Sequence, residues 1–122
     1  MKIAIPIDDK SMETSVCSSF GRTPYFLIYD TESKESVYLD NSAAAASQGG
    51  AGIKTAQTIV DNKVNALLTP RCGENAAEVL KAANVKLYKT VDASVVNNIK
   101  AFNDGQISLL ADIHPGFHGH GG

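Results

Sequence analysis

Cysteine is scarce in this sequence: Cys17 and Cys72 are the only two among 122 residues. Small secreted domains that depend on disulfides carry more, so we expect no disulfide framework. No apolar run approaches the roughly 20 residues that cross a bilayer, and the first residues lack the long apolar region of a secretory signal. These features predict a cytoplasmic protein that has no membrane partner and keeps both thiols reduced.

An excess of positive charge is also missing. The chain has 11 Lys and Arg residues against 13 Asp and Glu residues, a net charge of −2, and no run of three basic residues. Binding to nucleic-acid phosphates needs clustered positive charge, so we expect no nucleic-acid partner. The remaining composition, 43% hydrophobic and 20% charged, is that of a globular chain with room for one domain.

Hydrophobic periodicity predicts an α/β domain. Short apolar runs predict five strands, and apolar residues three or four positions apart predict three helices. The predicted strands are residues 3–7, 24–30, 35–40, 65–69 and 85–88. The predicted helices are one from Ile53 with a buried stripe of Ile53, Ala56, Val60 and Val64, one over residues 73–83, and one between an N-cap at Asp92 and Gly105. The order is therefore β-β-β-α-β-α-β-α, with residues 1–111 forming the domain and residues 112–122 a flexible Gly/His-rich tail.

This order predicts that three loops meet at one edge of the sheet. Helical crossovers imply parallel strands, and ligands of open α/β sheets bind beyond the carboxyl ends of such strands. Two of the loops also begin helices, where free N–H groups attract anions and glycines let a ligand approach the backbone. The candidate cofactor-binding residues in these loops are Cys17, Gly49, Gly50, Gly52, Arg71, Cys72, Gly73 and Asn75. Thiols, a cation and helix N-termini together suit an anionic, sulfur-rich metal species.

All three histidines, His114, His118 and His120, lie in the last nine residues. Imidazole is a common metal ligand, and glycine would let this segment fold around an ion, so these residues join Cys17 and Cys72 as candidate metal ligands. The alternative is a terminus that binds nothing, and either cysteine could simply be a small apolar core residue.

Signals of catalysis are weak. Asp8, Asp9 and Glu13 follow the first strand without clear carboxylate partners on other strands, and Ile53 interrupts the phosphate-loop pattern of residues 50–55. With every histidine in the tail, no Ser-His-Asp triad is expected, so we predict a protein that is not an enzyme. A redox-active thiol pair, or a regulatory module that binds a small ligand without catalysis, is the alternative function, although no Cys-x-x-Cys motif is present.

Several segments resemble the dinitrogenase iron-molybdenum cofactor biosynthesis family. They are Met1–Pro6, the most specific stretch Ser19–Asp30, the loop Asn41–Gly52 and Cys72–Ala76. The resemblance implies a ribonuclease H-like three-layer α/β/α fold with a five-stranded mixed sheet. It also implies a binding or carrier role, related to nitrogen fixation, for a metal-sulfur cluster or cofactor precursor that contains iron, molybdenum or copper. A cofactor-assembly protein is the expected partner, and the chain itself is expected to be a monomer or a weak homodimer.

Overall fold

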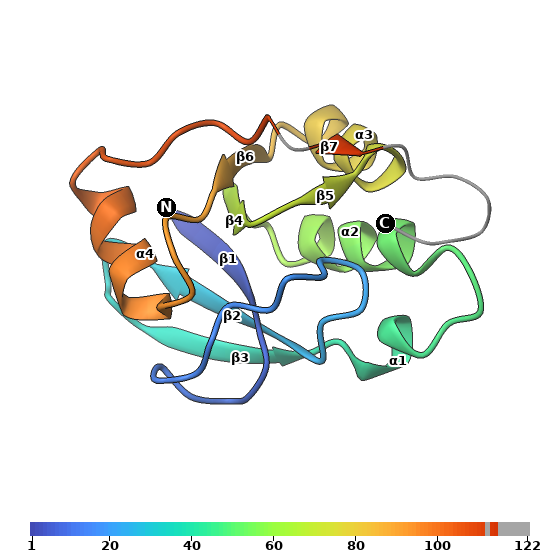
Figure 1. Cartoon of the computed structure of the whole chain (residues 1–122), viewed down its shortest axis with the longest axis horizontal. Coiled ribbons are helices and arrows are strands. Elements are labelled where there is room, and N and C mark those ends of the chain that lie inside the picture. The colour runs from blue at the N-terminus through green and yellow to red at the C-terminus, as the bar shows by residue number, and fades with distance from the viewer. Residues whose placement is uncertain (112, 115–122) are drawn as a thin grey trace.

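The computed structural model describes residues 1–111 and 113–114 as a mixed α/β fold around a five-stranded sheet (Figure 1). The order across the sheet is β3-β2-β1-β4-β6. Its strands are β1 (Lys2–Ile7), β2 (Tyr25–Asp30), β3 (Ser36–Asp40), β4 (Ala66–Thr69) and β6 (Lys86–Lys89). β2 runs antiparallel to β1 and β3, whereas β4 is parallel to both β1 and β6. The predicted five-stranded mixed sheet is therefore confirmed.

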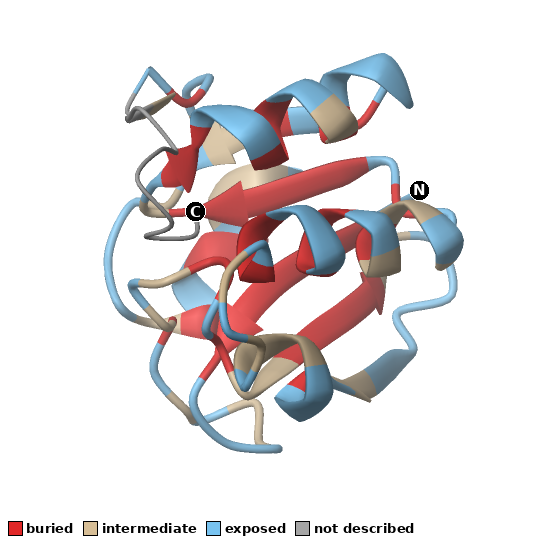
Figure 2. Ribbon diagram, turned by 90° about the vertical axis from the view of Figure 1, so that its right-hand side faces the viewer, coloured by how far each residue is buried: buried red, intermediate tan, exposed pale blue. Residues whose placement is uncertain are grey.

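Helices cover both faces of this sheet (Figure 1). The four helices are α1 (Ser42–Ala45), α2 (Ala51–Asp61), α3 (Glu74–Ala82) and α4 (Val95–Asn103). Side chains alternate along β1, so Ala4 joins the core beneath α2 and α3 while Ile3 and Ile5 join the core beneath α4. Figure 2 shows these buried strands behind α2 and α3, whose outer sides are exposed. None of the described helices is both long and apolar enough to cross a membrane.

The buried stripe of α2 differs from the predicted one. Ile53 is exposed and Val60 is only half-buried, whereas Gly52, Thr55 and Ile59 are buried. Apart from Ile59, small and polar residues occupy this face, because the backbone of Gly21 and the side chain of Asn41 approach the helix closely there. Ala56 and Val64 are buried as predicted, although Val64 lies beyond the end of the helix, whereas Ile53 and Val60 were wrongly placed on the buried face. The helix begins two residues earlier than predicted.

The N-cap of α4 also needs correction. Ser94, not Asp92, is the cap, and its Oγ accepts a hydrogen bond from the Asn97 N–H at 3.2 Å. The Asp92 carboxylate instead accepts bonds from the Ser94 N–H at 2.7 Å and from the Asn97 side chain at 3.1 Å. The acidic residue thus orders the turn that presents the cap.

A small second sheet was not predicted. It pairs β5 (Cys72–Gly73) with β7 (Ile113–His114) in parallel. Before β7, the chain runs along β6, where the Leu110 N–H donates to the Leu87 carbonyl at 2.9 Å. Residues 113–114 therefore belong to a strand rather than to the predicted flexible tail, and residues 115–122 lie outside the described part of the chain.

Candidate functional site

The carboxyl ends of the parallel strands bring the two cysteines to one edge of the sheet. The Cys17 N–H donates to the Pro6 carbonyl near the end of β1 at 2.8 Å. Cys72 follows the end of β4, the neighbouring parallel strand, by three residues. The prediction that both cysteines lie at the same edge is confirmed.

The pairing of Val16, the residue before Cys17, indicates toward which face of the sheet the Cys17 side chain points. Val16 pairs with Ile7, and both belong to the core beneath α4. Side chains alternate between the two faces along paired strands. We therefore infer that the Cys17 side chain points to the face opposite α4, the face on which Cys72 is buried. Cys17 is itself half-buried, which leaves part of the residue open to solvent.

Cys72 is a core residue in this structure. It is fully buried in the cluster that also contains Phe20, Ala76 and Leu110, with Ile113 packed against it. Its Sγ donates to the carbonyl of Gly73 at 3.5 Å. Burial raises the pKa of the Cys72 thiol to about 11, an effect that the positive charge of Lys81 only partly offsets. A ligand role for Cys72 stays a prediction, and it requires the thiol to leave this apolar surrounding.

Glycines shape the N-terminus of α2. Gly49 and Gly50 have φ values of +107° and +71°, and Gly50 is the N-cap, without any side chain that caps the helix. Side chains rarely adopt such angles, so glycine is required at this turn. A Cβ on Gly21 would lie 3.0 Å from both the N and the Cα of Gly52. The loop after Cys17 therefore packs directly on the first turn of α2.

A buried polar network holds the same loops together. The Asn41 amide donates to the Thr23 carbonyl at 3.0 Å and to Thr55 Oγ1 at 3.1 Å. Thr55 Oγ1 in turn donates to the carbonyl of Gly21 at 3.2 Å, and Thr23 Oγ1 donates to the carbonyl of Ile7 at 2.9 Å. Hydrogen bonds thus connect both the loop between β1 and β2 and the segment after β3 to Thr55 of α2. Sequence reasoning missed Asn41 and Thr55 because hydrophobic periodicity gives no signal for buried polar residues.

Arg22 supports the loop between α1 and α2. Its Nη1 donates to the carbonyls of Ala45 and Ser47 at 2.7 and 2.9 Å. Lys54 also reaches this loop, through a bond from Nζ to Ser47 Oγ at 3.2 Å. Together with buried Phe20, these contacts show that the stretch after Cys17 positions the glycine turn.

The second helix N-terminus lies beside Cys72. Buried Gly73 is the N-cap of α3 without a side-chain cap, while Arg71 and Asn75 on either side of it are exposed. The backbone between Thr69 and Arg71 turns back on itself, because Thr69 Oγ1 donates a hydrogen bond to the Arg71 carbonyl at 3.0 Å. The edge thus presents two helix N-termini that can attract an anion, and the attraction is weaker at α3, where exposed Glu74 adds a negative charge to the first turn.

The predicted metal-ligand set is only partly assembled. The backbone of His114 pairs with Gly73, beside Cys72, whereas His118 and His120 lie outside the described residues. Among the side chains that the structure describes, those of residues 1–111 and 113, no group of three or more His, Cys, Asp or Glu could hold a metal ion. Asp8, Asp9 and Glu13 are exposed and belong to no such group.

Comparisons with known proteins give consistent matches over most of the chain. The family described as dinitrogenase iron-molybdenum cofactor matches residues 1–105. An uncharacterized protein of Methanocaldococcus jannaschii is 31% identical over 110 residues, which cover 88% of this chain and 89% of that protein.

Solved structures share the fold. The apo form of the orange protein from Desulfovibrio gigas superposes with a TM-score of 0.86 at 29% identity, covering 91% of this chain and 93% of the other. A Thermotoga protein described as a candidate NifB protein gives a TM-score of 0.78 at 38% identity, with coverage of 89% and 92%.

Proposed function

Because this chain belongs to the dinitrogenase iron-molybdenum cofactor family, we propose that it binds or carries a metal-sulfur cluster or its precursor, and that it does not catalyse a reaction. One observation carries the proposal: two thiols and two helix N-termini without side-chain caps share one edge of the sheet. The proposal includes a ribonuclease H-like three-layer α/β/α fold for the chain. It also places the protein in the cytoplasm. The cargo would contain iron, molybdenum or copper and would pass to a cofactor-assembly protein.

The donor set suits a soft, anionic cargo. A half-buried thiol such as Cys17 can ligate soft metals once it is deprotonated. The N–H groups at the starts of α2 and α3, with exposed Arg71, would offset the negative charge of bridging sulfides. Two cysteines cannot supply the four thiolates of a usual iron-sulfur cluster, so sulfide or a second protein must complete the coordination.

The predicted histidine ligands would act at the periphery. His114 is joined through its backbone to the strand that carries Cys72 and Gly73. Metal bound by His114, His118 and His120 would therefore be only a few residues along the chain from the point where β7 pairs with the strand of Cys72. This arrangement fits a segment that collects metal for the edge.

An anaerobic titration tests the proposal. We expect tetrathiomolybdate together with Cu(I), or iron together with sulfide, to give a saturable visible absorption that stays with the protein on gel filtration. Cys17→Ser should weaken binding at least about 10-fold, because an alcohol is a poor ligand for soft metals. Truncation after His114 serves as the control and should leave the absorption at the loop edge intact. No saturable absorption with either mixture, or binding unchanged in Cys17→Ser, would overturn the proposal.

The redox alternative makes a different prediction. A reversible disulfide needs the two Cα atoms within about 7 Å and both thiols accessible. Burial of Cys72 opposes this second condition. Oxidation that links Cys17 to Cys72 quantitatively, in protein that takes up no metal, would favour the redox module.

A further inference from the structure

The two outer strands of the main sheet, β3 and β6, differ in whether another part of the chain pairs with their free side. At one edge, β6 is covered, because the Lys89 N–H donates to the Ser108 carbonyl and the Leu110 N–H donates to the Leu87 carbonyl, both at 2.9 Å. At the other edge, β3 pairs only with β2 among the residues that the structure describes. An open edge strand is a template for another strand.

The backbone of β3 shows which groups are left for such pairing. The Asp30 N–H donates to the Glu35 carbonyl, and the Asn41 N–H donates to the Pro24 carbonyl, so Glu35 and Asn41 face β2. Hydrogen-bonding direction alternates along an antiparallel strand. The N–H and C=O groups of Ser36, Tyr38 and Asp40 therefore point away from β2, toward the open edge.

These three residues are symmetric about Tyr38. In an antiparallel pair of two identical β3 strands, Tyr38 would face Tyr38 of the second copy, and Ser36 would face Asp40 at both ends. The same register opposes Val37 to Leu39. Facing residues must share a face of the sheet, and this register meets that condition at every position.

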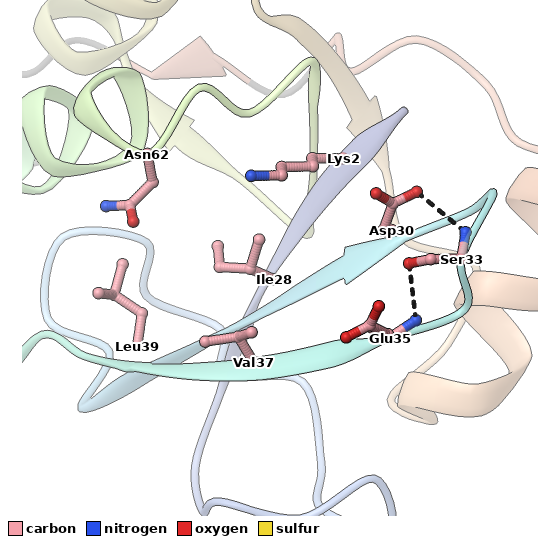
Figure 3. A pocket seen from close by; sticks show the side chains of 8 residues that line it. All are labelled: Lys2, Ile28, Asp30, Ser33, Glu35, Val37, Leu39 and Asn62. Atoms are coloured by element: carbon pink, nitrogen blue, oxygen red, sulfur yellow. Dashed lines mark hydrogen bonds between the residues drawn. The ribbon is translucent and has the colours of Figure 1, made fainter.

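The side chains fit the same register. Val37 is 60% exposed and lies beside half-buried Leu39 over the α2 side of the sheet. Figure 3 shows both beside Ile28, lining a hollow of about 300 Å³ whose rim carries Lys2, Asp30 and Glu35. A second β3 strand would oppose Leu39 to Val37 and so cover this apolar surface.

Charge agrees as well. The Asp40 carboxylate is charged at neutral pH, as for any aspartate of ordinary pKa, and side-chain and backbone hydrogen bonds from Ser42 lower its pKa further. In the symmetric register this carboxylate faces Ser36 of the second copy, with Lys34 at the diagonal position within reach of a long side chain. The Ser36 hydroxyl donates to Met12 Sδ at 3.7 Å in the single chain and would turn toward the carboxylate in the dimer. No like charges oppose each other between Ser36 and Asp40. The strand also lacks the proline, bulge or central lysine that usually protects an edge.

We propose that β3 is the homodimer interface of this protein, with two copies pairing antiparallel about Tyr38 to form one continuous ten-stranded sheet. The interface lies at the opposite side of the main sheet from β6. It leaves the proposed cluster edge open in both copies. The inference rests on the geometry of β3 and stands whether or not the chain carries a cluster.

Sedimentation equilibrium between about 10 µM and 1 mM tests the interface. We expect a concentration-dependent dimer, and Val37→Lys should raise its dissociation constant at least about 10-fold because it places a charge in each Val37–Leu39 pair. The matched control is Val96→Lys on α4, where the valine is 53% exposed and far along the chain from β3. Val96→Lys should leave the dimer unchanged, and far-UV circular dichroism should show both variants folded.

A cross-link tests the register independently. Facing residues of a hydrogen-bonded antiparallel pair have Cα atoms about 5.5 Å apart, which suits a disulfide. In a Cys17→Ser background, Tyr38→Cys should therefore form a covalent dimer on mild oxidation, whereas Val96→Cys should not. A monomer across the whole concentration range, or a dimer that Val37→Lys does not weaken, would overturn the proposal.

Discussion

In the native protein at pH 8, a thiol reagent should modify Cys72 at least about 100-fold more slowly than in the urea-unfolded chain. The thiolate is the reactive form, and burial raises the pKa of Cys72 from 9.0 to about 11. That shift alone lowers the thiolate fraction about 100-fold at pH 8, and exclusion of the reagent lowers the rate further. The measurement is the rate of modification in a Cys17→Ser variant, so that only one thiol reacts.

The pH dependence follows from the same pKa. The rate for native Cys72 should keep rising about tenfold per pH unit beyond pH 9, where an ordinary thiol levels off. Equal rates in the folded and unfolded chains, or a plateau at pH 9 in the folded chain, would contradict the burial of this thiol.

Removal of β7 should expose Cys72. Truncation after Ala111 deletes Ile113, which packs against the Cys72 cluster, and the strand that pairs with β5. We expect Cys72 to react at least about fivefold faster in this variant, because local opening becomes easier. Truncation after His114 keeps β7 and should leave the rate unchanged. An unchanged rate in both truncations would show that β7 does not shield the thiol.

Phe20→Ala should lower the free energy of unfolding by about 3–5 kcal/mol. Phe20 is fully buried, contacts Phe26 edge-to-face with ring centroids 5.5 Å apart, and belongs to the same cluster as Cys72. The truncation would leave a cavity between the loop after Cys17 and α2, where Gly21 already lies against Gly52. Urea unfolding followed by circular dichroism gives the free energy.

Phe102→Ala is the matched control. Phe102 makes a similar edge-to-face contact with Tyr88 at 5.6 Å, but it is half-buried and lies on the α4 face. Its loss should cost less than half as much free energy and should leave metal-sulfide binding intact, whereas Phe20→Ala should weaken that binding. A larger cost for Phe102→Ala would contradict the inference that the cluster around Phe20 holds the loop after Cys17 in place more strongly than the α4 face does.

The sequence was sufficient to predict a strand wherever a single continuous apolar run forms a single buried strand. β1 and β4 are continuous apolar stretches, and the helical connection between β3 and β4 implied the parallel edge that carries both cysteines. The phase of α2 was not accessible in this way. Apart from Ile59, its buried face consists of small and polar residues, selected by the close approach of Gly21 and by the hydrogen bonds of Asn41, which are contacts between distant parts of the chain.

The environment of the cysteines also depends on distant contacts. The sequence does not distinguish Cys17 from Cys72, yet Cys72 belongs to a buried cluster with Phe20 and Leu110, which come from remote segments. β7 pairs with β5 through only two residues, too few to give a periodic signal. The sequence could therefore place both thiols at one edge, but it could not show that one of them is part of the core.

Metal and sulfide analysis of untagged protein, purified without air, tests the central claim most directly. We predict stoichiometric iron, molybdenum or copper together with sulfide, lost in Cys17→Ser and retained after truncation at His114. Metal that survives in Cys17→Ser and disappears on truncation would assign binding to the histidine segment instead of the loop edge. Protein that contains no metal or sulfide, and acquires none on reconstitution, would contradict the proposal that this chain carries a metal-sulfur cargo.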